Sequence, residues 1–293
     1  MYKKVMDKIK TLKLLVSIFI TFAFFYFFQK IVGFDKLLDF FRFLTFKQIF
    51  LAFILYIFSY VVRTVRWSYT LSIKDFFKLF KLTVYNTFFN IVLPFRTGEI
   101  SFFYMLKKEN IHIAESTMSF IITRFFDGIS LLSLFFLAYF TYTNRFILGV
   151  ISFILLPFSF LILLFLFKFI KHEKIKNYNQ SMINFKNVFM VYFLSVLTLI
   201  FKFSAFYIVL PKEANLDFLQ SILASSLADL TTVLPVHGIA GIGTYETGYV
   251  GILIYLSVPK DTALLSAFLV HTFILISSSI LAIFVYLSKM FKL

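Results

Sequence analysis

The stretch that decides the fold reads Asn90-Ile-Val-Leu-Pro-Phe-Arg-Thr-Gly-Glu99. It interrupts an apolar segment with a proline, an arginine, a glycine and a carboxylate. A helix that faces lipid does not tolerate this sequence, because charges there cost several kcal/mol and freed backbone groups find no hydrogen-bond partners. The stretch therefore predicts a break in a membrane helix that does not face lipid.

A second stretch repeats this plan later in the chain. Residues 231–246 read Thr231-Thr-Val-Leu-Pro-Val-His-Gly-Ile-Ala-Gly-Ile-Gly-Thr-Tyr-Glu246. Both stretches carry Leu-Pro, then a basic or imidazole side chain, then glycine and glutamate. Two interrupted apolar segments at corresponding places in the two halves of a chain indicate a transporter's substrate site.

Composition sets the class of protein. The chain has 293 residues, of which 60% are hydrophobic and 15% charged, whereas a soluble domain is about half apolar and about a quarter charged. An integral membrane protein is therefore predicted. The net charge of +15 comes from lysines beside apolar runs, which favours anionic membrane lipids over nucleic acid as partners. The chain has no cysteine and its four histidines are far apart, so we predict no metal and no cofactor.

The predicted fold class is an all-α integral membrane protein with about six full transmembrane helices plus two re-entrant helical hairpins in an inverted repeat. The full spans are 14–28, 48–69, 115–142, 146–170, 188–210 and 262–287. The interrupted segments 82–106 and 218–257 have arms shorter than the about 20 residues that a span needs, which favours re-entrant hairpins.

The hairpins also predict how the chain is organised. Residues 1–293 form a single membrane domain with repeat units 48–143 and 188–287. The span 146–170 between them inverts the second unit, so that the two Leu-Pro tips meet near the middle of the bilayer.

Basic residues predict the orientation of the chain. They concentrate in the segments 1–13, 63–81, 107–108, 168–186 and 289–292, which places these segments and both chain ends in the cytoplasm. The second span ends with Arg63, Arg66, Trp67 and Tyr69, which we interpret as a basic and aromatic anchor at the lipid headgroups.

The candidate substrate-binding residues lie in the two interrupted stretches. Arg96 offers a planar fork for phosphate or carboxylate next to a helix start, and the alternative is that it pairs with Glu99 and holds the turn. Glu246 either stabilises a helix start or accepts a proton or a cationic headgroup. The full predicted set is Asn90, Arg96, Glu99, Thr231, His237 and Glu246, and the turn residues are Pro94, Gly98, Pro235, Gly238, Gly241 and Gly243.

Four other residues are predicted to support or couple this site. Arg124 and Asp127 are three apart on one helix face, which favours a structural ion pair. Asp229 caps or solvates the second hairpin, and His271 titrates near neutral pH or, as is commoner, forms a hydrogen bond in the interior. For Asn90 and Thr231 we favour hydrogen bonds to freed backbone groups over contact with a ligand.

These residues carry a family resemblance. The matching positions are Asn90-x-x-Leu93-Pro94-x-Arg96-x-Gly98-Glu99, Glu115 with Arg124-x-x-Asp127, and Leu234-Pro235 with Gly241-x-Gly243-x-x-Glu246. Over most of its length the chain resembles the lysylphosphatidylglycerol synthase/flippase transmembrane family of bacteria and archaea. The resemblance implies a flippase-type domain in a prokaryotic plasma membrane, with Arg96, Glu99, Arg124, Asp127 and Glu246 lining or supporting the lipid path.

The chain departs from the family pattern at two positions. Tyr245 and His271 stand where the resemblance leads us to expect arginines, which lowers the cationic charge of the second half. The namesake enzymes carry an aminoacyl-transferring domain after the membrane region, whereas this sequence ends at Leu293. We therefore expect no lysyl transfer and no enzyme activity.

The favoured function is a flippase that moves an anionic phospholipid or a lipid-linked headgroup between leaflets. The alternative in a different class is a membrane-embedded enzyme, or an enzyme partner, acting on a phospholipid or polyprenyl-phosphate. A transporter of a small soluble anion also stays open. A separately encoded lipid-modifying enzyme and a second copy of the chain stay open as partners.

Overall fold

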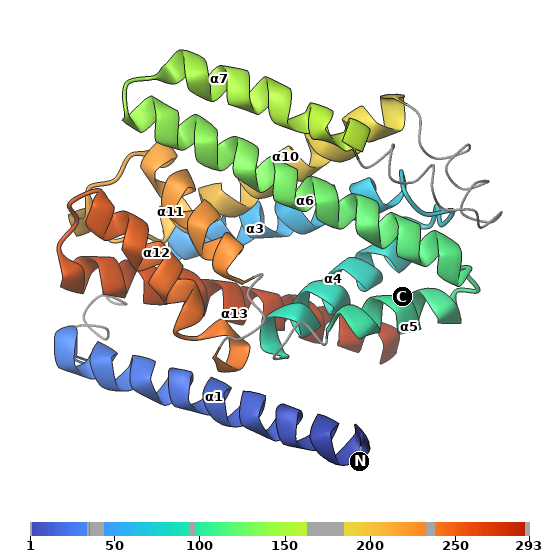
Figure 1. The fold of residues 1–293 in the computed structure, drawn as a ribbon, viewed down its shortest axis with the longest axis horizontal. Coiled ribbons are helices and arrows are strands. Elements are labelled where there is room, and N and C mark those ends of the chain that lie inside the picture. The colour runs from blue at the N-terminus through green and yellow to red at the C-terminus, as the bar shows by residue number, and fades with distance from the viewer. Residues whose placement is uncertain are drawn as a thin grey trace. The chain divides into compact units, whose positions relative to one another are not determined.

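The computed structural model describes residues 2–33, 35, 44–93, 98–162, 185–232 and 238–290. Every regular element in these ranges is a helix, which confirms the all-α prediction (Figure 1). The elements are α1 (Tyr2–Ile31), α3 (Phe46–Trp67), α4 (Phe76–Val92), α5 (Glu99–Lys108), α6 (Ile113–Tyr142), α7 (Phe146–Leu155), η2 (Leu156–Ser159), α10 (Phe185–Ile208), η3 (Lys212–Ala214), α11 (Phe218–Thr231), η4 (Ile239–Gly241), α12 (Thr244–Tyr255) and α13 (Lys260–Met290).

Four of these helices, α3, α6, α10 and α13, are long and apolar enough to cross a membrane. Only a third to a half of each apolar window is buried inside the protein, which leaves broad apolar faces for lipid. Shorter apolar helices at Leu15–Ile31 and Phe146–Ile162 occupy the places of the other two predicted spans. The chain is a multi-pass membrane protein, and the number of spans beyond four stays a prediction.

The helices form two compact units. Unit 1 contains Met1–Ala52, Thr87–Glu99 and Phe206–Leu293, and unit 2 contains Phe53–Asn86 and Ile100–Ala205. Unit 1 therefore contains both interrupted stretches, whereas most of α4 and α5 belongs to unit 2. The arrangement of the two tips relative to each other stays a prediction.

The second interrupted segment is a helical hairpin in unit 1. Asp217 begins α11 with a capping box, in which its side chain accepts from the Gln220 N–H at 2.8 Å and Gln220 Oε1 accepts from the Asp217 N–H at 3.0 Å. The helices α11 and α12 pack against each other, and a Cβ at Gly248 would lie 2.6 Å from Thr231 Cγ2. Their 14 and 12 residues are too few to cross a membrane.

The first interrupted segment is also a helical hairpin. Gly98 lies directly against the backbone of Phe89 and Asn90, where no Cβ would fit. At the other end, Lys78 Nζ lies 2.7 Å from Glu109 Oε2, so α5 returns along α4. The helix α4 begins at Phe76, six residues before the predicted arm, because the amphipathic segment before Leu82 is part of the same helix.

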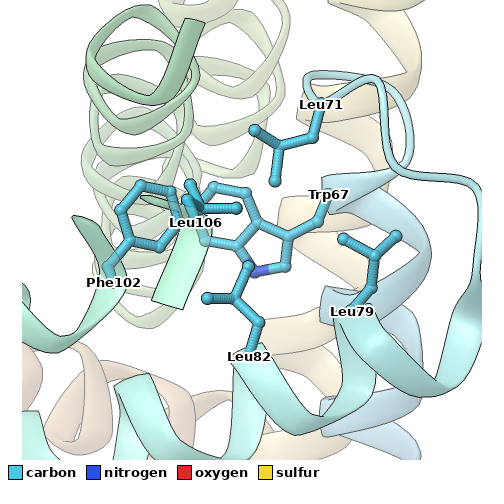
Figure 2. Close-up of a cluster of buried hydrophobic side chains, with 6 residues drawn as sticks. All are labelled: Trp67, Leu71, Leu79, Leu82, Phe102 and Leu106. Carbon is cyan, nitrogen blue, oxygen red and sulfur yellow. The ribbon is translucent and has the colours of Figure 1, made fainter. Parts of the chain in front are cut away.

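A cluster of large apolar side chains holds the base of this hairpin in unit 2 (Figure 2). The rings of Trp67 and Phe102 are 4.8 Å apart, and the cluster consists of Trp67, Leu71, Leu79, Leu82, Phe102 and Leu106. The prediction of a headgroup anchor is therefore wrong for Trp67, whose exposed fraction is 3%. The indole packs on α5, a contact that the local sequence does not reveal.

Candidate functional site

The break in the second hairpin is a turn with three residues in the left-handed region. Ala240, Gly241 and Gly243 have φ values of +53°, +81° and +90°. The N–H of Ile239 donates to Thr21 Oγ1 at 2.9 Å, so α1 packs against this turn. The glycines allow the backbone to reverse here and the next helix to begin at Thr244.

Glu246, in the first turn of α12, forms a hydrogen bond to the backbone of this turn. Its side chain is 2% exposed, and its Oε2 accepts from the N–H of Gly243 at 2.7 Å. Its Oε1 lies 2.7 Å from Nδ1 of His271, which α13 supplies and which is 4% exposed. The carboxylate thus stabilises the start of α12 and holds an interior histidine, and the prediction of a hydrogen-bonded His271 is confirmed.

The imidazole of His271 lies between two parts of the hairpin. The Tyr245 ring centroid is 4.7 Å from that of His271. A Cβ at Gly241 would lie 3.5 Å from Cε1 and 3.6 Å from Nε2 of the imidazole. The two departures from the family pattern, Tyr245 and His271, are therefore in contact with each other at the turn.

The side chain of Thr231 connects the end of α11 with the start of α12. The Thr231 hydroxyl lies 2.7 Å from the carbonyl oxygen of Ala228 and 3.0 Å from that of Thr244. These are the backbone hydrogen bonds that the sequence favoured for Thr231, and a contact with substrate stays a prediction. Asp229 is half-buried in the last turn of α11.

In the first hairpin, Asn90 lies in the last turn of α4 and Glu99 is the first residue of α5. Both side chains are half-buried, and Glu99 occupies the positive end of the α5 dipole. These residues belong to the same unit as Glu246 and His271. Four predicted site residues, Pro94, Arg96, Pro235 and His237, lie outside the described residues, so the choice between a ligand contact and an Arg96–Glu99 pair stays open.

A second charged site lies in unit 2. Asp127 on α6 accepts from Nη1 and, at 3.4 Å, from Nη2 of Arg66 on α3. Arg66 Nη1 also donates to Ser195 Oγ on α10 at 2.7 Å. The predicted Arg124–Asp127 pair is present, with Nη1 and Oδ2 3.7 Å apart, but it is the weaker of the two.

The headgroup interpretation of Arg66 is therefore wrong. Its side chain is 1% exposed and joins three helices, so it cannot reach lipid headgroups. Buried charges persist where they are paired and hydrogen-bonded, and Asp127 provides that partner. The structure thus favours a structural role for Asp127, in the unit that does not contain the hairpin breaks.

Comparison with known proteins identifies the family to which the chain belongs. The family model described as the lysylphosphatidylglycerol synthase TM region matches residues 12–282. The chain belongs to this family. No curated protein matches the sequence. The match spans both hairpins, and it assigns this member of the lysylphosphatidylglycerol synthase transmembrane family a role connected with membrane lipids.

Sequence reasoning missed two residues that organise this family member, Thr21 and Ser195, and gave a third, Arg66, the wrong role. Thr21 and Ser195 are small hydroxyl residues inside apolar runs, which commonly bond their own helix and so give no signal of a distant partner. For Arg66, the carboxylate of Asp127 in the middle of an apolar helix is a signal of a distant cation, but Arg124 on the same helix face provides a local partner. Among the described residues, no group of three or more histidines or carboxylates is placed to hold a metal ion.

Proposed function

We propose that this protein moves an anionic phospholipid or a lipid-linked headgroup between the two leaflets of the membrane. One observation carries the proposal. A single compact unit contains both interrupted hairpin breaks, and one break holds a buried carboxylate–imidazole pair. Ionisable groups inside a membrane are expensive and usually serve transport or coupling.

The two breaks offer complementary parts for a phosphate group. The helices α5 and α12 begin at the breaks, and a helix start carries partial positive charge with free N–H groups. Arg96 lies in the first break of the sequence and would supply a bidentate fork for the phosphate oxygens. The acyl chains would stay in lipid while the headgroup crosses between the hairpins.

The carboxylates of Glu99 and Glu246 at these helix starts affect which protonation state of the protein can bind an anion. Glu246 would repel a phosphate if its charge were left alone, but its Oε1 faces His271. A protonated imidazole cancels the carboxylate charge and leaves the helix dipole and Arg96 to attract the headgroup. Protonation of His271 therefore removes the net negative charge of the binding site we propose, because Arg96 and His271 then balance Glu99 and Glu246.

Lipid transfer in proteoliposomes tests this function. With fluorescent phosphatidylglycerol in both leaflets and a membrane-impermeant quencher outside, the wild type should expose the inner lipid to the quencher. Arg96→Ala should slow this exposure by about tenfold or more, because a charge-assisted hydrogen bond contributes about 1.5–3 kcal/mol.

The control for this experiment is Arg145→Ala, which removes an exposed arginine before α7 and should leave the rate unchanged. Equal rates for Arg96→Ala and the wild type would refute the phosphate role of Arg96. Uptake of labelled inorganic phosphate without any lipid transfer would instead identify a carrier for a soluble anion.

A further inference from the structure

The carboxylate of Glu246 does more than stabilise the start of α12, because it also contacts His271 on another helix. Both oxygens of Glu246 are engaged, one by the Gly243 N–H and one by the imidazole. Among the described residues, His271 is the one charge-bearing partner of this carboxylate. The pair also joins two helices, since Glu246 lies in the first turn of α12 and His271 lies in the middle of α13.

The charge of this pair depends on one proton. Glu246 accepts from the Gly243 N–H as a carboxylate. With a protonated imidazole the buried pair is neutral overall, whereas with a neutral imidazole it carries one uncompensated negative charge. An uncompensated buried charge strongly disfavours the closed arrangement, and separation of α12 from α13 would let water reach the carboxylate.

The backbone next to the pair can accommodate such a separation. Gly241 and Gly243 have positive φ and lie directly before α12, so small changes in their dihedral angles would redirect the helix start. Gly241 also faces the Cε1–Nε2 edge of the imidazole, so movement of the turn would uncover the second ring nitrogen.

We infer that Glu246 and His271 form a proton-binding site that closes the second hairpin against α13 when occupied and releases it when empty. This inference does not depend on lipid transfer. If the chain transports lipid as proposed, the same site would make the hairpin movement depend on protons.

The ionisable groups nearest the pair come from α12 and α11. Tyr245 contacts the imidazole, Tyr249 is buried one turn further along α12, and Asp229 lies at the end of α11. The charged residues of α13 near its start, Lys260 and Asp261, lie in its first turn, whereas His271 is in its middle. The α1 residues that contact the turn are Ile20, Thr21 and Phe24, which are uncharged. His237 lies in the sequence between α11 and the turn, outside the described residues, so the test includes it.

A single reporter cysteine can test the inference, because the chain has no cysteine of its own. Ala267 is fully buried on α13, one turn before His271 and on the same helix face. The measurement is the rate at which a small water-soluble thiol reagent modifies Ala267→Cys in the full chain in liposomes. Each rate is divided by the rate of an exposed Arg145→Cys reporter at the same pH, which cancels the ordinary increase in thiolate.

In the otherwise wild-type chain, this ratio should rise about tenfold between about pH 5.5 and pH 8.5, the range in which imidazole groups lose their proton. With His271→Arg the positive charge is permanent, and the ratio should stay low and flat. With Glu246→Gln there is no buried charge to compensate, and the ratio should be flat as well, which provides a second variant should His271→Arg fold poorly.

His237→Asn should leave the rise intact. A flat ratio in the wild-type background would overturn the inference. So would a rise that persists in both His271→Arg and Glu246→Gln, or a rise that His237→Asn alone abolishes. Because labelling needs no lipid transfer, a negative transfer experiment would count against the proposed function and leave this result unaffected.

Discussion

Replacement of Arg66 by alanine is expected to lower the free energy of unfolding by about 3 kcal/mol, because it removes the buried guanidinium that joins three helices and leaves the half-buried Asp127 with the weaker Arg124 contact alone. Ser195 would lose its hydrogen bond from the guanidinium in the same variant. The only tryptophan, Trp67, is the next residue and is buried in the unit 2 cluster. Its fluorescence during denaturant unfolding in detergent therefore reports on this part of the protein directly.

The matched control for Arg66 is Lys78→Ala. Lys78 also pairs with a carboxylate, that of Glu109, but the two side chains are 52% and 38% exposed. An exposed pair contributes at most about 1 kcal/mol, so this variant should unfold almost as the wild type does. A loss for Arg66→Ala no larger than that for Lys78→Ala would show that the buried pair does not hold α3, α6 and α10 together.

Gly98→Ala is the second change with a large expected effect. The added methyl group would overlap the backbone of Phe89 and Asn90, and neither backbone segment can rotate away as a flexible side chain could. We expect a loss of at least about 2 kcal/mol, measured by the same Trp67 fluorescence, because α5 carries the Phe102 ring that packs on the indole.

Gly251→Ala controls for the glycine-to-alanine change itself. Gly251 lies inside α12, and a Cβ there has no neighbour within 4 Å. Because alanine favours a helix over glycine by about 1 kcal/mol, this variant should be as stable as the wild type or slightly more stable. Equal destabilisation by the two substitutions would mean that the first hairpin does not close at Gly98.

Much of the helical organisation follows from short-range sequence signals. Pro94 with Gly98, and Pro235 with the glycines at 238, 241 and 243, mark two breaks, and helices end and begin around both. These signals work because proline and glycine act on the backbone within a few residues. The sequence predicts that the first arm begins at residue 82, later than the observed start of α4 at Phe76, because the first turns of α4 carry lysines that are typical of a segment at the membrane surface.

The interaction partners of the charged residues could not be predicted from such short-range signals. Arg66 contacts a carboxylate 61 residues away and a serine 129 residues away, whereas its sequence neighbours suggest a headgroup anchor. Glu246 and His271 are each candidates from the sequence, but their separation of 25 positions conceals that they touch. Ion pairs across helices depend on how the helices pack, and a single sequence does not contain that information locally.

Lipid transfer by the proposed route requires that both hairpin tips lie halfway through the bilayer. The most direct measurement attaches a fluorophore to single cysteines at Leu93 and at Ile239, the exposed residues beside the two breaks, and compares quenching by lipids that carry quenchers at different depths. Both labels should lie near the bilayer centre, about 15 Å from each edge of the hydrocarbon core, while labels at Lys74 and Arg145 should lie at opposite headgroup layers. Labels at Leu93 and Ile239 that report two opposite headgroup layers, or the same one, would contradict this placement of the tips.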